Sequence, residues 1–267
     1  MAVANLLIRG MLVGLVAAAL SFCFLKIAGE PAVDRAIAFE SRIDAAKAKA
    51  ARDEATAKGF PVAEQAAEPE LVSRTVQAGA GLFTGVAVYN VAFGGLFALV
   101  YALAYGRMGP FGARSTAALL AVSGFVAVYL IPTLKYPASP PSVGDSETIG
   151  LRTSLYFSAI AFSLAAMIGA WMLRNRLMRR LGAWNAAITA SAAYLIAVVL
   201  LCLAMPGVNE VPEGFPAVVL WRFRMASLGA QAIMWATLGL GFGALTERAD
   251  KVRIGAGWRT IPPRRRR

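Results

Sequence analysis

Long apolar stretches that contain no charged residue set the strongest limit on how this chain can fold. A helix that crosses the roughly 30 Å hydrocarbon core of a bilayer needs about 20 mostly apolar residues, because each residue advances it by about 1.5 Å. The uncharged stretches of about this length occupy residues 10–25, 75–106, 115–134, 153–173, 181–209 and 225–246. The first is short, and it spans if the flanking side chains of Arg9 and Lys26 extend to the interfaces. The sequence therefore predicts an all-α integral membrane protein with six transmembrane helices.

Composition agrees with a membrane protein and excludes several classes of soluble enzyme. Hydrophobic residues make up 58% of the chain and charged residues 16%, with a mean hydropathy of +0.60, whereas soluble domains carry about 25% charged residues. Histidine is absent, which excludes imidazole zinc sites, Ser-His-Asp triads and histidine proton relays. The two cysteines cannot form a disulfide framework. We expect no resident cofactor, and we predict that the chain is not an enzyme.

The positions of Lys and Arg predict how the chain is oriented. The net charge is +12, and more than half of the basic residues lie in the short segments 107–114 and 174–180 and in the tail 247–267. Basic residues concentrate in cytoplasmic loops, so we expect these segments and both termini in the cytoplasm. Most acidic residues lie in the alternate connections, which are expected outside. Residues 1–267 are thus predicted to form a single membrane domain of three successive in-out-in hairpins, with a basic cytoplasmic tail at 247–267.

The connection after the first span, residues 30–74, is expected to be an extracytoplasmic helical loop. Its first part is rich in alanine and interleaved charges, and Pro31 stands where a helix can begin. Ile37, Phe39 and Ile43 give it only a narrow apolar stripe, which favours a charged, solvated surface helix over a binding element. Arg9 and the first apolar stretch also fit a secretory signal, although no small-x-small cleavage site follows them.

A few small or polar residues inside the predicted spans indicate how the helices meet. Gly81-x-x-x-Gly85 and Gly239-x-x-x-Gly243 are typical of helix faces that pack closely in a membrane. Asn90 lies midway along the second predicted span, where lipid offers no hydrogen-bond partner. A hydrogen bond to a neighbouring helix and a role in conduction both explain this residue.

Two of the outer connections carry dense polar and proline-rich motifs. Residues 135–153 read Lys-Tyr-Pro-Ala-Ser-Pro-Pro-Ser-Val-Gly-Asp-Ser-Glu-Thr-Ile-Gly-Leu-Arg-Thr. Residues 209–216 read Asn-Glu-Val-Pro-Glu-Gly-Phe-Pro, and residues 221–229 read Trp-Arg-Phe-Arg-Met-Ala-Ser-Leu-Gly. Through these motifs the chain resembles the CbtA family of predicted cobalt transporter subunits, and the resemblance covers most of its length.

The resemblance implies a function and a partner. It implies a subunit of a cobalt uptake system in the bacterial inner membrane that serves cobalamin synthesis, with Co²⁺ as the transported ion. It also implies a small one-span CbtB-like subunit that carries a histidine-rich segment. A second hypothesis fits the residues as well: a structural membrane scaffold that binds partner proteins and transports nothing itself.

Polar residues of the two outer connections are candidate ligands for a divalent cation. Carboxylate and amide oxygens bind hard cations, although such ligands alone discriminate poorly for cobalt. The candidates are Asp145, Glu147, Asn209, Glu210 and Glu213. In the transport hypothesis they gather the cation at the outer face of the spans, and the selective step belongs to the histidine-rich partner.

A structural role for the same acids is the alternative. They are then expected to pair with Arg152, Arg222 and Arg224, which lie on the side of the membrane where basic residues are disfavoured. Because the second and third hairpins have the same orientation, we expect Asp145 or Glu147 to contact Arg222 or Arg224. Such a pair would close a lid over the outer end of the bundle.

Overall fold

The computed structural model describes residues 3–58 and 72–259, and all regular secondary structure within these ranges is helical. The α-helices are α1 (Val3–Phe24), α2 (Glu30–Ala57), α3 (Arg74–Val76), α4 (Leu82–Ala104), α5 (Ala113–Gly124), α6 (Ile131–Lys135), α7 (Ile149–Ala204), α8 (Ala217–Thr237) and α9 (Gly243–Arg259). The π-helical turns that join consecutive helices end to end are Leu25–Gly29, Gln77–Gly81, Phe125–Leu130 and Leu238–Phe242. Residues 59–71 of the predicted outer loop and residues 260–267 of the predicted tail lie outside the described ranges.

The described part of the chain has five helical segments that are long and apolar enough to cross a membrane. These segments are Val3–Ala57, Arg74–Ala104, Ala113–Lys135, Ile149–Ala204 and Ala217–Val252. Their outward faces carry large apolar side chains, and Ile27, Trp184 and Leu203 are each more than three-quarters exposed. Such a surface is unfavourable in water and favourable in lipid. The structure therefore agrees with the prediction of an all-α membrane protein.

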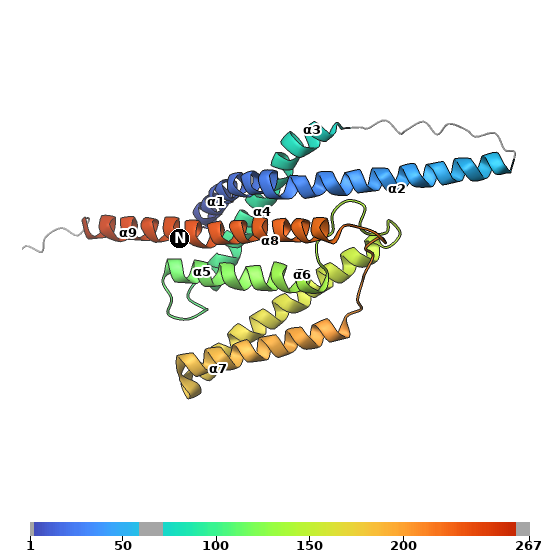
Figure 1. Cartoon of the computed structure of the whole chain (residues 1–267). Coiled ribbons are helices and arrows are strands. Elements are labelled where there is room, and N and C mark those ends of the chain that lie inside the picture. Colours follow the sequence, from blue (N-terminus) through green and yellow to red (C-terminus); the bar gives the residue numbers. More distant parts are fainter. Residues whose placement is uncertain (1–2, 59–71, 260–267) are drawn as a thin grey trace, which may run out of the picture.

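A helix begins next to Pro31, as predicted, but no loop separates it from the first span. α1 runs through the π-helical turn Leu25–Gly29 directly into α2 (Figure 1). A proline inside a helix lacks the N–H group and crowds the carbonyl four residues earlier. A π-helical turn ends two residues before Pro31, and another ends two residues before Pro132. We attribute the continuity of both helices to these turns, which widen the backbone where the proline removes a hydrogen bond.

The longest helix, α7, folds back on itself. It has 56 residues and one residue with non-helical dihedral angles, Gly182, at φ 73° and ψ 169°. Glycine adopts such a φ readily because it has no Cβ. The two arms run back alongside each other (Figure 1), and the hydroxyls of Ser163 and Tyr194 meet at 2.9 Å. The predicted connection 174–180 is therefore helical, and the reversal comes at Gly182 instead.

Two close helix contacts build the core. At the crossing of α1 and α4, a Cβ added to Gly94 would lie 2.1 Å from the carbonyl oxygen of Gly10. The π-helical turn after α8 approaches α5 as closely, since a Cβ on Gly239 would lie 2.7 Å from the Cβ of Ala121. The predicted packing role of Gly239 is thus confirmed. Among the described residues, Gly81 and Gly85 do not take part in such a crossing, because a Cβ on Gly81 would meet only the backbone of Val76 in the preceding turns and one on Gly85 would meet no atom within 4 Å.

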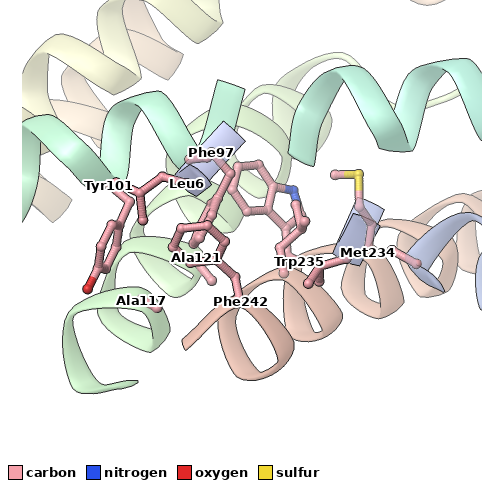
Figure 2. Close-up of a cluster of buried hydrophobic side chains, with 12 residues drawn as sticks. Leu6, Phe97, Tyr101, Ala117, Ala121, Met234, Trp235 and Phe242 are labelled. Carbon is pink, nitrogen blue, oxygen red and sulfur yellow. The ribbon is translucent and has the colours of Figure 1, made fainter. Parts of the chain in front are cut away.

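Aromatic side chains fill the space between these contacts. Figure 2 shows Phe97 and Tyr101 of α4 against Phe242, with ring centroids 5.4 Å and 4.9 Å apart. Trp235 and Leu6 belong to the same buried cluster. This cluster holds α1, α4, α5 and α8 together and fixes the helices that line the cavities described below.

The connections gather at two ends of the bundle. At one end, Arg174 donates to the carbonyl of Met108 (3.2 Å) and Asn175 to that of Arg107 (3.0 Å), which joins the 107–114 connection to α7. At the opposite end lie α2 and the connections 136–148 and 205–216 (Figure 1). The basic segments and the acidic motifs are therefore separated by the length of the bundle.

Candidate functional site

The two motif-bearing connections meet at the outer end of the bundle. The ammonium group of Lys135 donates to the carbonyl of Cys202 at 2.8 Å. The hydroxyl of Tyr136 donates to the carbonyl of Pro206, also at 2.8 Å. These bonds join the end of α6 to the end of α7, so the connections 136–148 and 205–216 start from a shared base.

Glu210 is the polar centre of this contact. Its carboxylate accepts the backbone N–H of Asp145 (2.8 Å) and the hydroxyl of Thr148 (2.7 Å), and it forms an ion pair with Arg152 at 3.2 Å. These groups lower the pKa of Glu210, chiefly through the hydrogen bond from Asp145 and then that from Thr148, with the charge of Arg152 adding to them. The carboxylate is therefore ionised at neutral pH, and its oxygens are already used within the protein.

Arg152 and Gly144 complete the same network. A guanidinium N–H of Arg152 donates to the carbonyl of Asp145 at 2.8 Å. Gly144 has a φ of 117°, and a Cβ there would lie 2.1 Å from Nη1 of Arg152. Only glycine therefore fits both the backbone conformation and the close approach of the guanidinium group.

The structure pairs the acids differently from the predicted lid. Asp145 accepts the backbone N–H of Glu147 at 3.0 Å, which closes a local turn. Arg224 donates to the carbonyl of Ala138 at 3.3 Å, and Arg222 is exposed. Within the described residues, no ion pair joins Asp145 or Glu147 to Arg222 or Arg224. Arg224 is thus bonded to backbone, and the acid–arginine contact at this end of the bundle is that of Glu210 with Arg152.

The predicted cation ligands do not form one compact cluster. Asp145, Glu147, Asn209 and Glu213 are exposed, and only Glu210 is partly buried. No group of three or more His, Cys, Asp or Glu that could hold a metal ion occurs among the residues that the structure describes. We call the exposed acids Asp145, Glu147 and Glu213 the outer rim; they lie on the two outer connections, and Glu210 belongs to the hydrogen-bond network between them.

A cavity of about 570 Å³ opens below this rim. Its charged lining residues are Arg152, Glu210 and Arg224, and hydroxyl groups of Tyr129, Thr133, Tyr136, Ser139, Thr153, Tyr156 and Ser227 surround them. The two motifs contribute Ala138, Gly144, Asn209 and Val211 to its walls. The prediction placed the loops correctly but missed Tyr129, Thr133 and Tyr156, which come from the apolar helices and were counted there as membrane-spanning sequence.

The first turns of α2 cover one side of these loops, so the prediction of a purely solvated helix was wrong for this part. Phe39 packs edge-on against Phe215 with ring centroids 5.0 Å apart. Ser142 donates to the carbonyl of Ala36 at 3.2 Å. Arg74, at the start of α3, forms ion pairs with Glu30 and Asp34 of α2. The remaining residues of α2 are largely exposed, as the interleaved charges predict.

Comparison with protein families decides the relationship of this chain. The family model described as "Probable cobalt transporter subunit (CbtA)" matches residues 3–247. The chain belongs to the CbtA family. The match spans four of the five long helical segments in full, most of the fifth, and both outer motifs, so the resemblance of the motifs is confirmed. No curated protein and no solved structure matches the chain. The family is described as a probable cobalt transporter subunit, which implies a partner, and transporter subunits are not a class of enzymes.

Proposed function

We propose that the chain is the membrane subunit of a cobalt uptake system that serves cobalamin synthesis. The family match over residues 3–247 carries this proposal. The cavity of about 570 Å³ at the outer end of the bundle supports it, because an importer needs a solvent-accessible space from which a cation can leave water.

The proposed arrangement has six spans in three in-out-in hairpins, with both termini in the cytoplasm of a bacterial inner membrane. The reversal of α7 at Gly182 supports it, because each arm is long enough to cross the bilayer. The basic connections at one end of the bundle and the acidic motifs at the other agree with the same orientation. Reporter fusions after Arg180 and Arg267 should be cytoplasmic and one at Gly144 external. An external reporter at Arg180 would exclude the arrangement.

The exposed acids Asp145, Glu147 and Glu213, together with Asn209, are proposed to gather divalent cations at the outer rim. Their charges are not used in ion pairs within the described residues. Negative charges at one end of the bundle raise the local concentration of a cation without forming a coordination shell. Selection of cobalt is assigned to the partner, a one-span CbtB-like subunit with a histidine-rich segment, because imidazole is the ligand that this chain lacks.

A structural scaffold that transports nothing is the second candidate. The network around Glu210 favours it, since this acid holds two connections together. Uptake of radioactive cobalt separates the two functions. Cells that express the chain with its small partner should accumulate cobalt, and cells with the partner alone should not. Equal accumulation in both would favour the scaffold.

A further inference from the structure

A second cavity, of about 310 Å³, lies among α1, α4 and α8 and is partly open to the outside of the bundle; it is called the inner cavity below. It shares no lining residue with the outer cavity. The residues that line it are Ser21, Leu25, Gly85, Val86, Tyr89, Asn90, Ala230, Gln231 and Met234. None of them is charged, yet four carry polar oxygen atoms in a part of the chain that is otherwise apolar.

Two side-chain amides in this cavity have unpaired acceptors. The Nδ2 group of Asn90 donates to the carbonyl of Val86 at 2.8 Å, one turn earlier in its own helix. The Nε2 group of Gln231 donates to the hydroxyl of Tyr89 at 3.1 Å. Oδ1 of Asn90 and Oε1 of Gln231 are both buried and have no hydrogen-bond partner among the described residues. The polar group at position 90 therefore does not serve as a hydrogen bond between helices.

A buried acceptor oxygen that has no hydrogen-bond donor is stabilised by a bound cation. Asn90 is only 3% exposed, and an unpaired oxygen in an apolar region loses the stabilisation that water gives it. A cation bound between two amide oxygens would satisfy both. The hydroxyl of Ser21 and the thioether of Met234 lie in the same lining, and Figure 2 shows the Met234 sulfur beside the buried cluster. Amide oxygens bind hard cations and a thioether binds softer ones.

One face of α8 connects the two cavities. Arg224 and Ser227 line the outer cavity, and Gln231 and Met234 line the inner one. The spacing of three, four and three residues places all four on one side of the helix. Gln231 lies one turn, about 6 Å, further from the outer end than Ser227. Along this face of α8, the unpaired oxygen of Gln231 is therefore the next polar group after the outer cavity.

We infer that the inner cavity is a transit site for a divalent metal cation, held by the side-chain oxygens of Asn90 and Gln231. The inference rests on the proposed transport function and adds an intramembrane site to it. A neutral set of ligands binds a divalent ion weakly and releases it readily, which suits a site that the ion passes through. A carboxylate at the same depth would bind more tightly and would slow release.

Binding of Co²⁺ alone to the full-length chain in lipid nanodiscs tests the site. Equilibrium dialysis with radioactive cobalt should give affinities about tenfold or more weaker in Asn90→Leu and Gln231→Leu than in the wild type. Asn90→Asp keeps the shape of the side chain and should bind more tightly. Gly79→Ala is the glycine control outside the cavity, since its new Cβ meets no atom within 4 Å. Thr246→Val is the control elsewhere, since Thr246 is also buried with an unpaired hydroxyl.

Uptake by cells with the same variants completes the test. Asn90→Asp should combine tighter binding with slower cobalt uptake, a pairing that a structural role does not produce. Wild-type affinity in all three variants would overturn the inference and leave water as the content of the cavity. If all variants bind Co²⁺ and take it up as the wild type does, the site is excluded and the transport function remains. If the wild-type chain binds Co²⁺ but cells that express it together with the partner take up no cobalt, the transport function is excluded and the site remains.

Discussion

The outer and inner cavities differ in how their polar atoms are satisfied. In the outer cavity, Glu210 accepts two hydrogen bonds and forms an ion pair with Arg152. Its carboxylate therefore holds the connections 136–148 and 205–216 together. In the inner one, the oxygens of Asn90 and Gln231 accept nothing from the described residues. A saturated carboxylate has no acceptor left for a ligand, whereas an unsaturated neutral oxygen can accept a further group. To identify a metal ligand in this protein, the number of unpaired acceptor oxygens on a side chain is therefore a better guide than its formal charge.

The strongest test of the inner region removes the helix contact that frames it. Gly94→Ala places a Cβ 2.1 Å from the carbonyl oxygen of Gly10, where backbone meets backbone and neither can move aside. We expect a loss of stability of about 3 kcal/mol or more and little protein in the membrane. Gly85→Ala in the same helix should keep normal abundance. Quantitative immunoblots of membrane fractions measure both, and normal abundance of Gly94→Ala would contradict the helix crossing.

A glycine also tests the outer network. Gly144→Ala must adopt a φ of 117° and would place its Cβ 2.1 Å from Nη1 of Arg152. Backbone strain of this kind costs about 1–3 kcal/mol, so the unfolding temperature should fall by several degrees. Gly150→Ala, where nothing lies within 4 Å, is the matched control. If both variants melt together with the wild type, the outer network does not contribute to stability.

Glu210→Gln should have a smaller effect that depends on pH. Because the folded protein lowers the pKa of Glu210, the ionised carboxylate stabilises the fold at neutral pH. This contribution is present above the pKa that the group has in the unfolded chain and is lost as the pH falls through the lowered pKa of the folded state. Melting curves of wild type and variant should differ at pH 7 and converge in acid. A constant difference across that range would show that the charge of Glu210 is not what stabilises the loops.

The exposed rim should give the smallest effect. Joint replacement by Asp145→Asn, Glu147→Gln and Glu213→Gln removes negative charge without touching the network below it. We expect the apparent KM for cobalt uptake to rise a few-fold at low ionic strength, with normal abundance, and to approach the wild-type value in about 0.15 M salt. Uptake rates measured at several cobalt and salt concentrations would detect this. A defect that does not depend on salt would indicate direct coordination instead.

The sequence predicted the helical membrane class because apolar length is a local property. It also predicted that the two outer motifs lie together, since the alternation of spans places them on one side. Local pattern did not predict that α1 continues past Pro31 or that α7 reverses at Gly182. Both depend on backbone geometry, a π-helical turn in one helix and a positive φ in the other.

For the candidate sites, too, the sequence predicted individual residues but not the contacts between them. Acidic residues in the outer motifs are visible in sequence, but their partners are not, and Arg152 rather than Arg222 or Arg224 pairs with an acid. Asn90 stood out in the sequence as a polar residue in an apolar span. That it lines one cavity with Gln231 could not be predicted, because this requires α4 and α8 to pack against α1.

Cobalt uptake per molecule of protein in the membrane compares the two regions most directly. Asn90→Leu and Glu210→Gln are expressed with the small partner, and uptake of radioactive cobalt is divided by the amount of each variant in the membrane. The contrast between the cavities predicts that uptake per molecule falls several-fold in Asn90→Leu and stays near the wild-type value in Glu210→Gln. Normal uptake per molecule in Asn90→Leu with a loss in Glu210→Gln would contradict it and return the metal to the outer acids.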